Sequence, residues 1–194
     1  MTPPTRPERA RWPVTFALAA ALAVAAAACG DDPFEFDWSD APDTVLLYSL
    51  AHPDLNLASG FAFLARRRIR VESPSATGTW DAAVDTRGGE IVLLPPGALG
   101  VTSEARIATI DGMALEDVTE APADTAVYVG DQPVPVQPGT VYVVKTNRVP
   151  GSFGSRCVYY AKVEAVAIDV AAGTLEFRYV TNPVCNSRDL VPPR

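Results

Sequence analysis

The sequence has 194 residues, which fits one domain, and its 48% hydrophobic and 20% charged content excludes a disordered polar chain. Its 18 prolines and 13 glycines exclude a helix bundle, because proline breaks helix interiors. A formal net charge of −7 argues against nucleic acid as a partner, and three cysteines without paired spacing predict neither a disulfide-dense scaffold nor a zinc site.

The first 28 residues have the pattern of a signal peptide. Arg6, Arg9 and Arg11 make a basic start, and residues 14–28 follow without a charge. That uncharged run is shorter than the roughly 18 to 20 apolar residues that a membrane-spanning helix needs, and it ends in small residues. We therefore expect residues 1–28 to direct export and to be removed. The sequence has no twin-arginine pair, so export in the unfolded state is favoured.

The end of this segment, Ala26-Ala27-Ala28-Cys29, allows two interpretations. Small residues at 26 and 28 suit ordinary signal peptidase. The same four residues resemble the bacterial lipobox, and that resemblance implies that Cys29 is lipidated and becomes the mature N-terminus. Both interpretations cleave the same bond, and we favour the lipidated one. The resemblance implies two or three acyl chains, which anchor a protein durably. Gly30 after the cysteine favours the outer membrane, at its periplasmic face or the cell surface, if the source has one.

Residues 29–43 are predicted to be the lipidated cysteine and an acidic tether. Residues 30–43 carry six acids and no base, a composition typical of a solvated spacer. Phe34, Phe36 and Trp38 alternate, so we expect this aromatic side to dock on the domain as an edge strand. An acidic strip for a partner or for calcium is the alternative, although no EF-hand spacing is present. Removing residues 1–28 takes three arginines and one glutamate from 16 basic and 23 acidic groups, which leaves a net charge of −9.

From Thr44 the sequence predicts strands. β-Branched and aromatic residues predict strands over 44–50, 60–71, 79–86, 90–94, 105–110 and 126–129. Gly88-Gly89 is a turn signal, and Pro95-Pro96 ends the strand over 90–94. Residues 112–121 fit either a helical turn or a loop. Pro133, Pro135 and Pro138 exclude a central strand in their segment.

The C-terminal third predicts an antiparallel hairpin. Residues 140–146 are apolar on both faces, as in a central strand. The strand over 158–170 changes the parity of its apolar residues, which predicts a β-bulge near residues 164–167. After a turn at 171–173, Leu175, Phe177 and Tyr179 face inward. About nine or ten short strands predict an all-β fold, an antiparallel sandwich or partly open barrel, over a single domain at 44–194.

Cys157 and Cys185 flank this hairpin and are predicted to form a disulfide. Exported proteins meet an oxidising compartment, and with Cys29 lipidated no thiol is left over. Reduced ligands or redox thiols are the alternative, which the lack of a Cys-x-x-Cys motif disfavours.

Few residues indicate catalysis. His52 is the single histidine and precedes a proline, so we expect a polar loop residue. Residues 151–155 contain serines but lack the spacing of a nucleophile elbow, which predicts a flexible loop.

Asp81 and Asp85 offer paired carboxylates of the kind that drive glycoside hydrolysis. We interpret them instead as the outward face of an alternating strand whose other face holds Trp80, Ala82 and Val84. Trp80 and the tyrosines at 142, 159, 160 and 179 are expected in the core.

Four arginines form one basic cluster. On a strand, Arg66, Arg68 and Arg70 would line one face, and Arg67 would lie on the other with Ile69 and Val71. A solvated or ion-paired face is the plain interpretation. The alternative is an anion-binding site for lipid phosphate or a cell-wall polymer, because the guanidinium fork suits phosphate.

Two stretches resemble the HmuY-like lipoproteins. The first is Trp80-Asp81-Ala82-Ala83-Val84, and the second comprises residues 141–146 (VYVVKT), 160–163 (YAKV) and 173–177 (GTLEF). The resemblance covers about 70 residues of strand-like motifs and implies a β-rich, surface-anchored fold. The best-known members of that family bind heme through a histidine pair, whereas this sequence has only His52. We therefore expect neither heme nor another cofactor, and no metal.

These observations favour a lipid-anchored extracytoplasmic protein with a non-catalytic β domain that binds an unidentified envelope ligand or protein. Its membrane contact would run through the lipid on Cys29. A structural component of the cell envelope is the alternative, and a carboxylate-dependent hydrolase is a lesser one.

Overall fold

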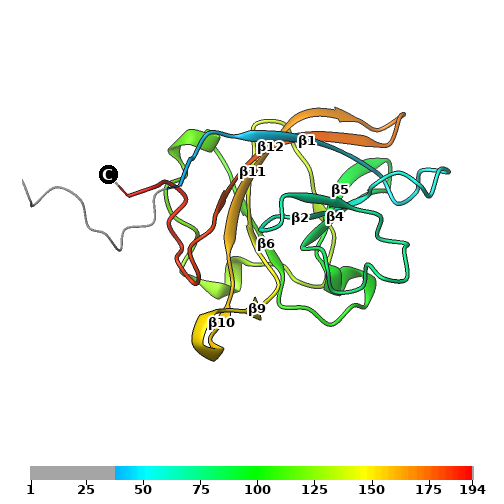
Figure 1. The fold of residues 1–194 in the computed structure, drawn as a ribbon. Coiled ribbons are helices and arrows are strands. Elements are labelled where there is room, and N and C mark those ends of the chain that lie inside the picture. The colour runs from blue at the N-terminus through cyan, green and yellow to red at the C-terminus, as the bar shows by residue number, and fades with distance from the viewer. Residues whose placement is uncertain (1–37, 194) are drawn as a thin grey trace, which may run out of the picture. The chain divides into compact units, whose positions relative to one another are not determined.

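Two antiparallel β-sheets of five strands each form the domain. Figure 1 shows the path of the chain through them. The computed structural model describes residues 38–193, except for the side chain of Phe153. The signal peptide, Cys29, Phe34 and Phe36 lie outside the described residues. Within residues 38–193 the helices are 3₁₀ turns of three or four residues, and none has the length and apolarity to cross a membrane. The all-β prediction is confirmed, and the architecture is a sandwich.

Sheet 1 contains the longest strands, in the order β1, β12, β11, β8, β6. β8 lies between β11 and β6, which confirms the central position predicted from its two apolar faces. The bounds are β1 (Asp43–Tyr48), β6 (Arg106–Ile110), β8 (Val141–Lys145), β11 (Tyr160–Asp169) and β12 (Thr174–Asn182).

Sheet 2 has the order β3, β2, β4, β5, β7. Gly88 and Gly89 turn β4 into β5 with φ of 62° and 84°, a left-handed conformation that glycine adopts without strain. β7 contains a proline and lies at the edge of the sheet, as its sequence predicted. The bounds are β2 (Gly60–Ala62), β3 (Arg67–Ile69), β4 (Ala82–Arg87), β5 (Glu90–Leu94) and β7 (Val134–Pro135).

The segment 60–71, expected as one strand, is a hairpin of two short strands. Phe61 pairs with Arg68 across it, and Arg66 takes a positive φ of 48° in the turn. Phe61 and Phe63 are both buried, so the chain reverses directly after its apolar run. β3 is therefore an edge strand, and its arginines lie at the margin of the sandwich.

The main core fills the space between the sheets. Phe61 of sheet 2 packs against Tyr179 of sheet 1, with ring centroids 4.9 Å apart, and against Phe63 at 5.0 Å. Leu175, Phe177 and Tyr179 all face this core, as their alternation predicted. Each aromatic ring that is buried here removes about 150–250 Å² from water, so this cluster dominates the packing energy.

The outer face of each sheet is also covered. Trp80 and Leu94 pack on the outside of sheet 2, beside the 3₁₀ helix η1 (Pro96–Leu99). Leu115 of η2 (Leu115–Asp117) and Leu190 cover the outside of sheet 1. The undecided segment 112–121 is thus a loop with one 3₁₀ turn. The strand expected over 126–129 is largely the 3₁₀ turn η3 (Thr125–Val127), and only Val129 forms a bridge, to Ile107.

β11 contains the predicted bulge. Its register against β12 shifts between Ala165 and Ala167, which leaves Val166 as the extra residue, 55% exposed. Ala165 and Ile168 both pack against the main core, which explains the change of parity in the sequence.

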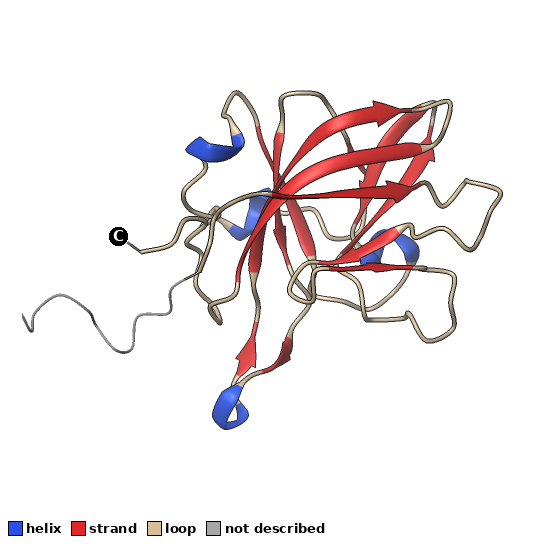
Figure 2. Ribbon diagram, turned by 45° about the horizontal axis from the view of Figure 1, so that its top comes forward, coloured by secondary structure: helices blue, strands red, loops and turns tan. Residues whose placement is uncertain are grey.

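A small hairpin of β9 (Val149–Pro150) and β10 (Arg156–Cys157) projects from the sandwich and carries the 3₁₀ turn η4 (Ser152–Gly154) at its tip, as Figure 2 shows. Cys157, at its base, has its Cα atom 5.0 Å from that of Cys185 and lies in disulfide geometry with it. The predicted pairing joins this hairpin to the segment after β12.

The folded domain includes residues before Thr44, the predicted start of the domain. β1 starts at Asp43, and Trp38 is only 8% exposed although residues 38–42 form no strand. Trp38 is therefore buried, as expected for a segment that docks on the domain, but residues 38–42 do not form the expected edge strand.

Candidate functional site

Three neighbouring pockets surround the edge strand β3 and the loop over residues 70–80. Their volumes are about 240, 270 and 300 Å³. Arg70 and Ser73 line both the first and the second pocket, and Thr79 lines both the first and the third. The pockets thus form one continuous margin of sheet 2, which we take as the candidate functional site.

The first of these, the arginine pocket, is lined by Arg67, Arg68 and Arg70. Three hydroxyl-bearing residues face the same space: Ser73, Ser75 and Thr79. The edge position of β3 explains this gathering, because a strand without an outer neighbour leaves both its faces open to the same margin. Guanidinium and hydroxyl donors together suit an oxyanion.

The guanidinium groups of this pocket have few partners. Arg70 donates to the amide oxygen of Asn56 at 3.4 Å. Among residues 38–193, no ion pair involves Arg67, Arg68 or Arg70, whereas five other arginines of that part are paired with acids. The protein has a net negative charge, but these three arginines have no acidic partner and make the surface locally positive.

Arg66 does not belong to this group, although the sequence placed it on one face with Arg68 and Arg70. It lies in the β2–β3 turn, and its guanidinium pairs with Asp43 of β1 at 3.2 Å. Arg67, predicted on the opposite face, lines the pocket instead. Consecutive residues of both parities, 67 to 70, border this pocket, so the alternation of β3 does not separate Arg67 from Arg68 and Arg70.

The third pocket, the Asp81 pocket, has Asp81 among its lining residues, with Leu64, Thr79, Asn147 and Val149. Asp81 is 7% exposed and directly precedes β4. One carboxylate oxygen accepts a hydrogen bond from the backbone N–H of Asn147 at 2.8 Å, and the other accepts from that of Phe63 at 2.9 Å.

Burial raises the pKa of Asp81 from 3.8 to about 6, although the two backbone hydrogen bonds from Asn147 and Phe63 act in the opposite direction. No cation in the described part of the chain contributes to this pKa. The carboxylate is therefore a desolvated charge without a counterion.

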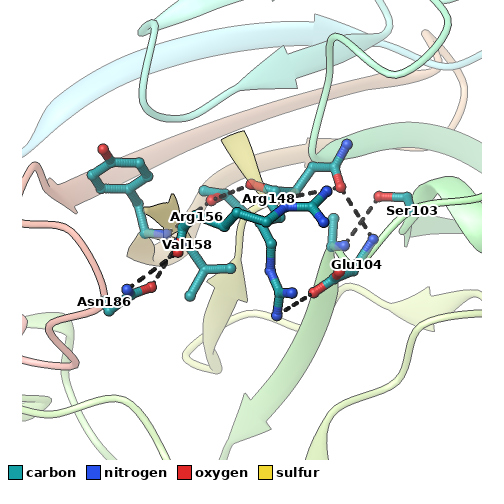
Figure 3. A network of polar contacts seen from close by, with 10 residues as sticks. Ser103, Glu104, Arg148, Arg156, Val158 and Asn186 are labelled. Atoms are coloured by element: carbon teal, nitrogen blue, oxygen red, sulfur yellow. Dashed lines mark hydrogen bonds and ion pairs between the residues drawn. The ribbon is translucent and has the colours of Figure 1, made fainter. Parts of the chain in front are cut away.

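A polar network supports Asn147 from the other side. Its amide oxygen accepts from the backbone N–H groups of Glu104 at 3.2 Å and Arg148 at 2.9 Å. The side chains of Arg148 and Glu104 are ion-paired at 2.8 Å, and Figure 3 shows this pair beside the β9–β10 hairpin. In the same view Asn186 bonds to the backbone of Val158 and Arg156. The side chain of Asn147, which lines the Asp81 pocket, is thus held by the backbone N–H groups of Glu104 and Arg148.

Asp85 shares the outer face of β4 with Ala83, as the alternation predicted, but this face is covered rather than open to solvent. Asp85 is 9% exposed, accepts from the backbone N–H of Ala51 at 3.2 Å and pairs with Arg87 at 2.9 Å. Both faces of β4 are covered, because loops pack on the outside of sheet 2. Asp81 and Asp85 bind different partners, and Asp85 does not line any of the three pockets.

Trp80 does not share a face with Ala82 and Val84, contrary to the prediction. Ala82 and Val84 belong to the core between the sheets, whereas Trp80 packs with Ala83 on the outer side of sheet 2. Trp80 is nevertheless buried, at 2% exposure. Regular alternation starts only at Ala82, where β4 begins.

The remaining candidate residues lie apart from the pockets. His52 is in a loop, where its Nδ1 accepts from the backbone N–H of Asp54 at 3.1 Å. Tyr142 and Tyr179 are core residues, whereas Tyr159 and Tyr160 are half-buried. Within residues 38–193, no cluster of three histidine, cysteine or acidic side chains is placed to hold a metal ion.

Sequence reasoning missed that Asp81 is a pocket residue. The available signal was Ala83, an apolar residue on the face that was assigned to solvent between the two aspartates. No protein-family model matches this sequence, and a search of curated proteins gave no match.

Proposed function

We propose that this protein is a lipid-anchored extracytoplasmic lipoprotein whose β-sandwich binds an anionic envelope ligand without catalysing a reaction. The anchor is the lipid on Cys29, and the binding site is the arginine pocket at the edge of sheet 2. The membrane of residence under this proposal is the outer membrane.

The pairing of Cys157 with Cys185 is the observation that carries the proposal. The sequence has three cysteines, and two of them lie in disulfide geometry. A disulfide of this kind persists in an oxidising compartment, which requires export. It leaves one cysteine, Cys29, at the position where the lipobox resemblance places the acyl chains.

The arginine pocket supports the choice of ligand. Arg67, Arg68 and Arg70 bring three guanidinium groups to a space of about 240 Å³, which suits one phosphoryl group with part of its carrier. Charge-assisted hydrogen bonds of this type give both affinity and geometric selection.

Mass spectrometry of the mature N-terminus tests the anchor. We expect Cys29 to carry acyl chains, the protein to fractionate with membranes, and Cys29→Ser to be released from them. An unmodified Cys29 thiol on a protein that is soluble after export would refute the lipoprotein assignment.

Binding is tested separately, on the mature Cys29→Ser protein, so that the anchor does not contribute. Inorganic phosphate and phosphatidylglycerol vesicles distinguish a free anion from a lipid headgroup, with phosphatidylcholine vesicles as the neutral control. We expect the triple variant Arg67→Gln, Arg68→Gln, Arg70→Gln to bind at least about tenfold more weakly, since it loses three charge-assisted contacts. Arg66→Gln is the matched control and is expected to bind as the parent does. Equal binding by the triple variant and its parent would contradict the assignment of this pocket.

A further inference from the structure

The Asp81 pocket has hydrogen-bonding capacity that the fold does not use. An ionised carboxylate offers about four lone-pair positions, and each oxygen of Asp81 is occupied by one backbone N–H, from Asn147 or from Phe63. About two acceptor positions therefore remain on a side chain that lines a pocket of about 300 Å³.

Thr79 and Thr146 also line this pocket, and the hydroxyl oxygen of Thr146 already accepts from the backbone N–H of Tyr159 at 2.9 Å. The hydroxyl of Thr79 donates to the backbone oxygen of Ala76 at 2.8 Å, and that of Thr146 donates to the backbone oxygen of Asn147 at 3.0 Å. Because each hydroxyl has one proton, both protons are committed. The oxygen of Thr79 keeps its lone pairs, and it lies on the lining of the pocket with Asp81.

The charges around the pocket leave Asp81 uncompensated. Arg148, which follows Asn147 in the chain, is neutralised by Glu104 at 2.8 Å. Arg67 lines the neighbouring arginine pocket and not the Asp81 pocket. A desolvated carboxylate of this kind gains most from a ligand that supplies a positive charge and hydrogen-bond donors together.

The rest of the lining is apolar. Leu64, 39% exposed, stands at the pocket with Ala62, Ala65 and Val149. These side chains offer contact to methylene groups but no counter-charge. The pocket therefore combines an anionic acceptor with an aliphatic wall.

We propose that the Asp81 pocket binds a primary ammonium group carried on a short aliphatic chain, with the ammonium on Asp81 and the chain against Leu64 and Val149. An ammonium has three donors and no acceptor, which matches the unused acceptors described above. The chemistry is that of a free alkylamine or of a lysine side chain. This site does not depend on the lipid anchor or on the arginine pocket.

A titration of the mature Cys29→Ser protein with pentylamine, followed by ¹⁵N NMR, tests the proposal. The amides of Phe63 and Asn147 are direct reporters, because both donate to Asp81. We expect saturable shifts of these two amides with pentylamine and none with 1-pentanol, which has the same chain without the charge. Equal shifts with both compounds, or no shift with pentylamine, would overturn the proposal.

Two variants separate the role of Asp81 from a loss of folding. Asp81→Asn removes the charge, and we expect at least about tenfold weaker binding of pentylamine. Asp85→Asn removes a second buried carboxylate, which lies in β4 and outside the pocket, and the binding of pentylamine to this variant is expected to be unchanged. Ala65→Arg changes an exposed residue at the pocket and is expected to abolish binding by blocking the space, even if Asp81→Asn does not fold. Retained binding in Ala65→Arg would place the amine elsewhere and overturn the assignment.

The two sources of the ammonium are distinguished with a capped peptide, acetyl-Ala-Lys-Ala-amide, against its norleucine analogue. Tighter binding of the lysine peptide than of pentylamine would identify a polypeptide ligand, and the reverse order would identify a free amine. Equal binding of the lysine and norleucine peptides would show that the charge is not recognised, which contradicts the proposal.

Discussion

The carboxylate of Asp81, just before β4, accepts a hydrogen bond of 2.8 Å from the backbone N–H of Asn147, just after β8. These residues belong to opposite sheets of the sandwich, so one side chain joins the two layers at their margin. The second oxygen of Asp81 accepts from Phe63 in the β2–β3 turn. Asp81 therefore satisfies two backbone donors while it lines a pocket.

The first prediction concerns these two hydrogen bonds. Asp81→Asn keeps one acceptor oxygen, whereas Asp81→Ala keeps none, and neither variant carries a charge. We expect the free energy of unfolding of Asp81→Ala to be lower than that of Asp81→Asn by about 1–3 kcal/mol, the cost of leaving a buried donor without a partner. Urea denaturation at pH 7 measures the difference.

The matched control is Asp54, an exposed residue that accepts from the backbone N–H of Asn56 at 2.9 Å. Its Asn and Ala variants are expected to differ by less than about 0.5 kcal/mol, because water replaces a lost partner at the surface. If the Asp81 variants differ by no more than the Asp54 variants, Asp81 does not hold the sheets together.

The second prediction is a dependence of stability on pH. The pKa of Asp81 is about 6 in the folded protein and near 3.8 in the unfolded chain. Between these values the folded protein holds a proton that the unfolded chain has lost, so the free energy of unfolding falls as pH rises through this window. A shift of about two units corresponds to roughly 3 kcal/mol.

We expect this contribution in the difference between wild type and Asp81→Asn, measured from pH 4 to pH 8, since other acids titrate alike in both. Wild type should lose stability relative to the variant by roughly 2–3 kcal/mol over that range. A constant difference would mean that the pKa of Asp81 is not raised in the folded protein.

The elements that the sequence predicted best are those whose pattern reflects burial on known faces. Leu175, Phe177 and Tyr179 alternate because one face of β12 packs on the core, and the parity change after Glu164 reports the bulge directly. Gly88-Gly89 defines its turn through backbone conformation alone. Such features are local, and local sequence specifies them.

The candidate site was harder to predict because it depends on contacts between distant segments. Asp81 lies next to Asn147 only once the two sheets have packed, and nothing in its neighbouring residues indicates that partner. The turn at Arg66 divides the expected strand into two short ones, so Arg66 pairs with Asp43 and lies apart from the arginine pocket. Alternation predicts the outward face of β4, but it does not predict that residues from loops pack on this face and bury Asp85.

The third prediction concerns the disulfide of Cys157 and Cys185, which closes a loop with a sequence separation of 28. The double variant Cys157→Ala, Cys185→Ala is expected to lose about 3.5 kcal/mol of stability in the chain-entropy model. Thermal unfolding of the variant and of the oxidised parent measures this loss. Alkylation of native parent protein is the check on the premise, and two reactive thiols there would refute the bond.

The last prediction concerns Lys162, whose side chain is buried on the outer face of β11, at 2% exposure. Its ammonium donates to the backbone oxygen of Val118 at 3.0 Å, and burial lowers its pKa against the opposing effect of nearby acids, Asp40 foremost. The bond fastens the loop that carries η2 onto sheet 1. Lys162→Met keeps the aliphatic stem but removes the donor.

We expect Lys162→Met to lower the free energy of unfolding by about 1–3 kcal/mol, since a buried carbonyl oxygen loses its partner. Hydrogen exchange should also become faster in residues 115–118, because the loop loses its attachment. Lys145→Met is the control, as Lys145 is the other lysine of the chain and is half-buried. Unchanged exchange over 115–118 in Lys162→Met would show that apolar packing of Leu115 alone holds the loop on the sheet.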